Sequence, residues 1–189
     1  MCIRDRVSGS GRSLENLASR SSDLGIEIGL VLSDRDGIRA LEIAERHGLP
    51  GVVVAPRRYA DAAAAGEAMW AAIRAAGVEL VVLAGFLKLL PVPAEWSGRV
   101  INIHPSLLPK YGGKGFFGNR VHAAVLAAGD TTSGCTVHYV DAEYDTGPPL
   151  LQHTVPVEAG DTTEDLAARV FAAEQEALPE AIRKHFART

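Results

Sequence analysis

The sequence is short of cysteine, of clustered histidine and of excess positive charge. Its 189 residues include two cysteines, Cys2 and Cys135, which are too few for a disulfide framework or a cysteine-based metal site. The six histidines are scattered, without the His-Glu-x-x-His spacing of a zinc enzyme, so we expect no metal. Lysine and arginine total 19 against 23 acidic residues, which gives a net charge of -4. A broad nucleic-acid surface needs the opposite balance, so we expect no nucleic-acid partner.

Long apolar runs are also missing. None reaches the roughly 18 residues that cross a bilayer, and the N-terminus has no apolar signal-peptide region. We therefore expect no membrane partner and a cytoplasmic location. Hydrophobic residues make up 47% and charged residues 22%, as is typical of a globular chain, and the length suits one domain, which we place at residues 7–189.

Residues 1–6 do not fit that domain. The Gly/Ser segment at 8–13 should follow a buried strand of continuous Val, Ile or Leu, but Arg4, Asp5 and Arg6 are charged. We interpret residues 1–6 as a truncated or non-native terminus, with a very short first strand as the alternative.

Short apolar segments alternate with segments of helical periodicity along the rest of the chain. This alternation predicts an α/β fold with a mostly parallel, twisted sheet and helices on both faces. The last two strands are expected to pair antiparallel at the C-terminal edge, and Pro179 to kink or restart the last helix. The expected strands are 26–33, 52–54, 79–84, 100–104, 135–140 and 149–157. The first expected helix begins at Leu14, and four further helices are expected at 38–47, 60–76, 120–128 and 162–178.

The most distinctive stretch is 100–109, an apolar strand that carries Asn102 and His104 and ends in prolines. Two positions apart on a strand, both side chains point to one face. An amide donor beside a histidine can stabilise and protonate a carbonyl-derived intermediate, although two structurally satisfied polar groups are the alternative. The acidic segment 141–147 favours the functional interpretation, because a carboxylate beside His104 would raise its pKa and make it a general acid.

A second candidate is the segment 8–13 (SGSGRS), whose backbone N–H groups at a helix start would suit a phosphate. It lacks the third glycine of a dinucleotide-binding loop, and an ordinary Gly/Ser turn is the alternative. Ligands of open α/β sheets bind at the carboxyl ends of strands, so we expect 8–13, 85–90 and the Asn102–His104 pair to converge.

The other polar candidates are discounted from the residues alone. His138 is assigned to a strand, while His47, His153 and His185 are interpreted as surface positions. His122 is left unassigned beside the Gly-rich loop 112–119, and the spacing of Glu174 indicates a solvated charge.

The segment 102–109 (NIHPSLLP), together with 8–13, 82–86 and 141–147, resembles the family of formyltransferases that use 10-formyltetrahydrofolate. The resemblance covers nearly everything from Val7 onward. It implies a Rossmann-like formyltransferase fold and an enzyme of purine synthesis that formylates the amine of glycinamide ribonucleotide, with 10-formyltetrahydrofolate as co-substrate and no metal.

The same resemblance implies roles for individual residues, including a ligand role for Glu174 in place of a solvated charge. Asn102, His104 and Asp145 would be catalytic. The implied substrate-binding residues are Gly11, Arg12, Ser13 and Glu174, and the implied folate-binding residues are Leu87, Lys88, Leu89, Leu90, Asp141, Ala142, Glu143 and Tyr144.

Four alternatives remain open at this stage. The acceptor could be the amine of a sugar nucleotide or of methionyl-tRNA, the reaction could be hydrolysis by a formyltetrahydrofolate deformylase, or the chain could be a non-catalytic anion-binding module. The acidic charge balance counts against a tRNA substrate. The expected assembly is a monomer or a homodimer.

Overall fold

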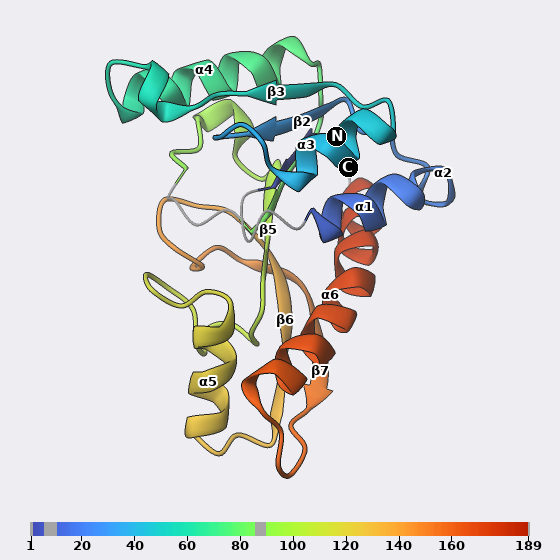
Figure 1. Ribbon diagram of the computed structural model, residues 1–189, viewed down its shortest axis with the longest axis vertical. Helices are drawn as coiled ribbons and strands as arrows, with labels where there is room; N and C mark the ends of the chain where they lie inside the picture. The colour runs from blue at the N-terminus through green and yellow to red at the C-terminus, as the bar shows by residue number, and fades with distance from the viewer. Residues whose placement is uncertain (1, 6–10, 86–89, 189) are drawn as a thin grey trace. The chain divides into compact units, whose positions relative to one another are not determined.

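The computed structural model describes residues 2–5, 11–85 and 90–188. It divides into two compact units, Met1–Ile101 and Asn102–Thr189, whose elements are labelled in Figure 1. We describe each unit by itself, and the expected single domain at 7–189 stays a prediction. Among the described residues no helix is long and apolar enough to cross a membrane.

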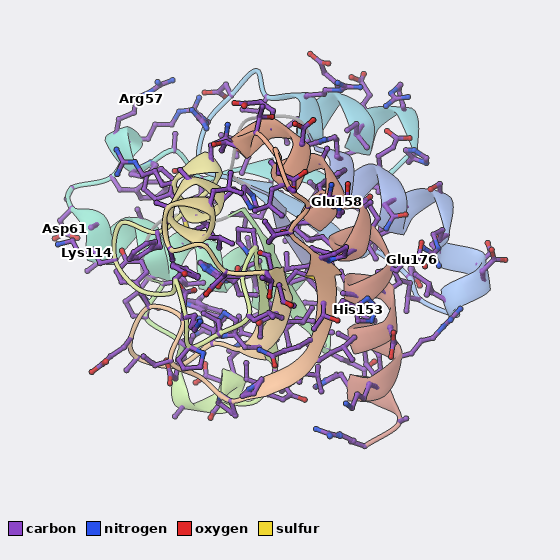
Figure 2. All side chains as sticks on the ribbon, turned by 90° about the horizontal axis from the view of Figure 1, so that it is seen from below. Arg57, Asp61, Lys114, His153, Glu158 and Glu176 are labelled. Carbon is purple, nitrogen blue, oxygen red and sulfur yellow. The ribbon has the colours of Figure 1, made fainter. Side chains whose placement is uncertain are left out.

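The first unit contains parallel strands in the order β3-β2-β1-β4. All four residues of β2 and of β4 are buried, which explains why both strands are continuous apolar runs. Asp61 caps the longest helix of this unit by accepting a hydrogen bond from the Ala64 N–H at 2.8 Å, and Figure 2 labels it. The elements are β1 Cys2–Asp5, α1 Arg12–Ser19, α2 Ser21–Leu24, β2 Leu30–Ser33, α3 Arg39–Arg46, β3 Gly51–Val53, α4 Ala62–Ala75 and β4 Val81–Ala84, with 3-10 turns at Pro56–Arg58 and Ala94–Trp96.

Strand β1 is the very short first strand given above as the alternative, and a truncated or non-native terminus stays a prediction. Cys2 pairs with Leu30 on one side and Val81 on the other, and the parallel register continues along both neighbours. Pairing uses the backbone N–H and C=O groups, which every residue but proline offers, so charged residues do not prevent it. Four residues are enough, which matches the alternative of a very short strand.

The second unit is built on β6 (Thr132–Tyr139) and β7 (Pro149–Pro156), which pair antiparallel with Cys135 opposite His153. This confirms the expected antiparallel strands at the C-terminal edge of an α/β fold. Strand β5 (Val100–His104) has the bounds expected from the sequence and passes from the first unit into the second at Asn102.

Helix α5 (Asn119–Ala127) and helix α6 (Thr163–Phe186) pack in the same unit, with α6 against β6, β7 and α5. Thr162 and Asp165 form the capping box that starts α6. The expected restart at Pro179 is wrong, since α6 continues to Phe186 as one helix, while a kink at Pro179 stays a prediction. Pro179 and its neighbours Leu178 and Ile182 are buried, so packing compensates for the hydrogen bond that proline removes.

Candidate active site

Asn102 and His104 lie at the end of β5, where His104 is buried and Asn102 half-buried. The Asn102 Nδ2 atom lies 3.1 Å from His138 Nε2, and His138 Nδ1 lies 2.9 Å from the Tyr139 carbonyl oxygen. The carbonyl can only accept, so in the neutral His138 ring the proton sits on Nδ1 and Nε2 accepts from the Asn102 amide. This arrangement fixes the direction in which Asn102 points its donors.

His104 is held at both ring nitrogens. Its Nε2 lies 2.8 Å from the carbonyl oxygen of Tyr111, and its Nδ1 lies 3.5 Å from Asp145 Oδ2. The Tyr111 carbonyl assigns the proton of the neutral ring to Nε2, and the second proton of the imidazolium would sit on Nδ1, facing Asp145.

The pKa of His104 is lower than the ordinary value, contrary to the expectation of a raised one. Burial lowers it, while the Asp145 carboxylate and the Tyr111 carbonyl act in the opposite direction and the charge of His138 lowers it again. The side chain is only 5% exposed, so the cost of burying the charged ring exceeds the gain from a carboxylate at 3.5 Å. His104 is therefore a stronger acid when protonated than an exposed histidine.

Asp145 lies between the two histidines. Its Oδ2 accepts the Gly113 N–H at 2.9 Å, and its Oδ1 lies 3.5 Å from His138 Nε2. Burial acts to raise the pKa of Asp145, but the contact with His138, the charge of His104 and the Gly113 N–H together lower it. Asp145 is consequently an anion at neutral pH, at 11% side-chain exposure.

The backbone around Asp145 is shaped to hold it there. Asp145 has a φ of 58°, in the left-handed region that few residues other than glycine adopt, although Asp and Asn tolerate it. The preceding Asp141 closes the loop, because its Oδ1 accepts from the Glu143 N–H at 3.2 Å and from the Thr146 hydroxyl at 2.8 Å. Gly147 packs so tightly on the Tyr139 carbonyl that a Cβ would collide with it.

His138 is the site residue that the sequence interpretation missed. It was discounted because it lies inside a strand, yet β6 ends one residue later and places its ring against Asn102 and Asp145. A usable signal was present, since a histidine at the end of a strand that leads into an acidic loop occupies the edge where ligands bind.

The remaining histidines have varied settings. His185, expected at the surface, is 5% exposed and its Nδ1 lies 3.0 Å from the Tyr139 hydroxyl. His47 and His153 are at the surface as expected, His47 beside Glu15 and His153 on β7 beside Glu180, and Figure 2 labels His153. His122 on α5 is buried, and its Nδ1 has no hydrogen-bond partner.

The two buried histidines His104 and His122 predict a stability that falls in mild acid. Burial lowers the pKa of each, and the charge of His104 adds to the effect at His122. A histidine with a lowered pKa binds its proton more weakly when folded, so stability is lost as the pH falls through about 6.5. The lowered pKa of Asp145 has its effect only below about pH 4.

We therefore expect urea titrations to give a smaller free energy of unfolding near about pH 5.5 than near about pH 7.5. The decrease should be smaller in His122→Leu, which removes one of the two groups. An equal decrease in the variant and the wild type would contradict a role for His122.

Of the predicted phosphate loop, Ser8, Gly9 and Ser10 lie outside the described residues. Gly11 has a φ of 59° and precedes α1, while Arg12 is exposed and Ser13 half-buried in its first turn. A Cβ on Gly11 would collide with the Ile43 side chain and crowd the Ala40 backbone, so this position requires glycine. The expected convergence of 8–13 and 85–90 with Asn102 and His104 stays a prediction.

Leu87, Lys88 and Leu89 of the predicted folate pocket also lie outside the described residues, and Leu90 is buried. In the 141–147 loop, Asp141, Ala142 and Glu143 are exposed and Tyr144 is half-buried. Contact of these residues with a folate stays a prediction.

Glu174 is half-buried on α6, near Cys135 of β6. Burial, together with the charge of Glu174, raises the pKa of Cys135 to about 12. Cys135 is therefore a neutral thiol at physiological pH and is not an activated nucleophile. Within residues 2–5, 11–85 and 90–188, no three His, Cys, Asp or Glu side chains converge to hold a metal ion, and the expected absence of a metal stays a prediction.

Comparison with known proteins places this geometry in context. A family model described as formyl transferase matches residues 6–182. The trifunctional purine biosynthetic protein adenosine-3 of Drosophila pseudoobscura pseudoobscura is 42% identical over 182 residues, which cover 93% of this chain and 13% of that protein. A chloroplastic phosphoribosylglycinamide formyltransferase of Vigna unguiculata is 37% identical over 180 residues, covering 93% of this chain and 58% of that protein. The chain thus spans less than two thirds of the length of both relatives.

Solved structures agree with these sequence relatives. Glycinamide ribonucleotide transformylase 1 from Symbiobacterium toebii has a TM-score of 0.86 at 38% identity, covering 97% of this chain and 86% of that chain. Phosphoribosylglycinamide formyltransferase from Brucella melitensis has the same TM-score and identity and covers 97% of this chain and 94% of that chain. The likeness confirms the expected formyltransferase fold.

Proposed function

The chain belongs to the formyl transferase family, and from this premise we propose that it transfers a formyl group from 10-formyltetrahydrofolate to the amine of glycinamide ribonucleotide. The observation that carries the proposal is the cluster of Asn102, His104 and Asp145 at the end of β5, held by direct contacts within one unit. The names of the relatives in Vigna unguiculata and Brucella melitensis support the choice of acceptor.

In the proposed reaction the amine attacks the formyl carbon, a carbon–nitrogen bond forms, and the bond to folate N10 breaks. The carbonyl oxygen becomes negatively charged in between. The Asn102 amide, oriented by His138, donates to this oxyanion from a fixed position. Preorganised donors of this kind stabilise the transition state without having to rearrange.

His104 supplies the proton and the positive charge in its imidazolium form, which is the minor form at neutral pH because its pKa is lowered. The Tyr111 carbonyl anchors Nε2, so the proton that can move is the one on Nδ1, where the acceptor Asp145 lies at the longer distance of 3.5 Å. A lowered pKa makes this imidazolium a good donor to the leaving N10, which takes up one proton as the attacking amine loses one. Asp145 stabilises the charged ring until the transfer.

The proposed binding residues follow the family resemblance. The Gly11, Arg12 and Ser13 backbone would hold the substrate phosphate at the start of α1, and Glu174 would bind ribose hydroxyls. Leu87, Lys88, Leu89 and Leu90 would contact the folate, together with residues 141–144. The location is proposed to be cytoplasmic and the assembly a monomer or homodimer.

An assay with competing acceptors tests the proposal. The folded protein is mixed with 10-formyltetrahydrofolate and, separately, with glycinamide ribonucleotide, an amino-sugar nucleotide, methionyl-tRNA or no acceptor, and the release of tetrahydrofolate is followed. We expect release with glycinamide ribonucleotide alone. Release with another amine would reassign the acceptor, release without one would indicate a deformylase, and no release would leave a binding module.

A further inference from the structure

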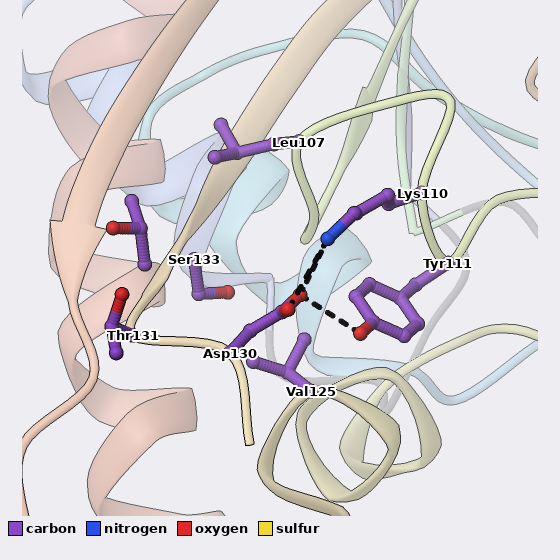
Figure 3. A pocket seen from close by; sticks show the side chains of 8 residues that line it. Leu107, Lys110, Tyr111, Val125, Asp130, Thr131 and Ser133 are labelled. Atoms are coloured by element: carbon purple, nitrogen blue, oxygen red, sulfur yellow. Dashed lines mark hydrogen bonds and ion pairs between the residues drawn. The ribbon is translucent and has the colours of Figure 1, made fainter. Parts of the chain in front are cut away.

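A second polar cluster surrounds Asp130, which connects α5 to β6. The Lys110 ammonium lies 3.2 and 3.1 Å from the two carboxylate oxygens, and the Tyr111 hydroxyl donates to Oδ2 at 2.9 Å (Figure 3). The hydrogen bond from Lys110, followed by that from Tyr111, lowers the pKa of Asp130, so the carboxylate stays charged. None of these three side chains belongs to the catalytic group proposed above.

Tyr111 connects this cluster to His104 through its backbone. Its side chain binds Asp130, while its carbonyl oxygen accepts the His104 Nε2 proton at 2.8 Å. Tyr111 has a φ of 55°, which a residue with a bulky side chain rarely adopts unless its surroundings impose it. The contacts of Tyr111 therefore hold a strained backbone whose carbonyl orients a catalytic ring.

Two neighbours of Tyr111 are also held by hydrogen bonds, and one of these bonds reaches the catalytic group. The Ser106 hydroxyl donates to the Lys110 carbonyl at 2.6 Å, and the Gly113 N–H donates to Asp145 Oδ2. A displacement of residues 110–113 would consequently change the surroundings of His104 and Asp145 together.

An open cavity beside the cluster makes the Asp130 contacts more important. It has a volume of about 330 Å³, and its lining residues are Leu107, Lys110, Tyr111, Val125, Asp130, Thr131, Thr132 and Ser133 (Figure 3). The cavity opens to solvent, and the Lys110 side chain is 67% exposed, so protein packing does little to hold it in place. The T-shaped contact with Phe116 supports the Tyr111 ring, but Phe116 is itself exposed.

We propose that Asp130 is a positioning residue for the reaction: by binding the Lys110 and Tyr111 side chains it holds the Tyr111 carbonyl on His104 Nε2. This keeps the neutral ring in the Nε2–H tautomer and leaves Nδ1 as the nitrogen that exchanges its proton. The link to catalysis rests on the proposed function, whereas the link to the His104 ring does not.

The variants that test this are Asp130→Ala, which removes both contacts, and Tyr111→Phe, which removes one hydroxyl and keeps the ring. Glu180→Ala is the matched control, since it removes an exposed carboxylate that binds His153 at 2.9 Å in the same unit. The readouts are the ¹⁵N and ¹H spectra of the His104 ring against pH, kcat and KM for the folate, and the thermal midpoint.

In Asp130→Ala we expect the Nε2–H tautomer of His104 to lose population and its pKa to fall further, because the Tyr111 carbonyl raises that pKa in the wild type. The groups facing His104 directly, Asp145, His138 and His122, are unchanged in this variant. We expect kcat to fall about 10-fold with KM nearly unchanged. Tyr111→Phe should show the same changes in smaller degree, and Glu180→Ala none.

An Asp130→Ala protein with the wild-type His104 spectrum and pKa would overturn the proposal, even if its thermal midpoint were lower. If Asp130→Ala does not fold, Tyr111→Phe is judged by the same criterion. If the wild-type protein has no transferase activity but Asp130→Ala changes the His104 spectrum, the proposed function is overturned and the positioning role is kept. If the wild-type protein is active but Asp130→Ala leaves the His104 spectrum unchanged, the positioning role is overturned and the proposed function is kept.

Discussion

Replacement of His104 by alanine should lower kcat by about a thousandfold, the largest effect we expect from any single side chain. The variant loses both the proton on Nδ1 and the positive charge beside the developing oxyanion. It also leaves the Asp145 carboxylate without one of its two histidine neighbours. Steady-state kinetics with 10-formyltetrahydrofolate and glycinamide ribonucleotide measure the change.

His153→Ala is the matched control for this experiment. His153 also lies on a strand and also contacts a carboxylate, Glu180 at 2.9 Å, but its side chain is 28% exposed. Its kcat should stay within about threefold of the wild type, as expected for a surface pair of little energetic weight. Circular dichroism of both variants shows whether they are folded. A folded His104→Ala protein with near wild-type kcat would contradict the assigned role.

Asp145→Asn should have the second largest effect, a decrease of kcat by about a hundredfold. Asparagine tolerates the left-handed φ of 58° and can still accept the Gly113 N–H, so the loop geometry is kept. The negative charge is lost, and with it the attraction that counteracts burial at His104. The pKa of His104 should therefore fall further below its ordinary value, as an NMR titration would show.

Asp145→Ala separates charge from backbone conformation. Alanine at this φ costs about 1 to 2 kcal/mol, so the alanine variant should be less stable than the asparagine variant. Both should share the loss of kcat if the charge is what matters. A fully active Asp145→Asn with reduced activity only in Asp145→Ala would show that the loop, and not the carboxylate, supports catalysis.

Much of the fold could be predicted because most of its strands are short apolar runs that can be recognised from neighbouring residues alone. The strand 100–104 is an apolar run that ends in prolines, and the structure has the same bounds. Two elements depended on distant partners instead. Strand β1 forms despite its charged residues because its backbone N–H and C=O groups pair with β2 and β4. Helix α6 continues through Pro179 because packing against neighbouring elements supports it.

The candidate site was predicted in part. The sequence points to Asn102, His104 and Asp145, and the structure places them in one cluster, while their catalytic roles stay a proposal. The expected rise in the pKa of His104 was wrong. A sequence pattern shows which groups are adjacent and does not show how deeply they are buried, and burial is the dominant cause here. His138, Tyr111 and Asp130 act through contacts between segments up to 36 residues apart, which no local pattern reports.

The most direct test of the account is a transfer experiment with a labelled formyl group on 10-formyltetrahydrofolate, with glycinamide ribonucleotide as acceptor. The account predicts that the wild-type protein moves the label onto the ribonucleotide as an N-formyl group and releases one tetrahydrofolate for each product, while folded His104→Ala does so about a thousandfold more slowly. Label that remains on the folate, or that appears as free formate, with folded wild-type protein would contradict it.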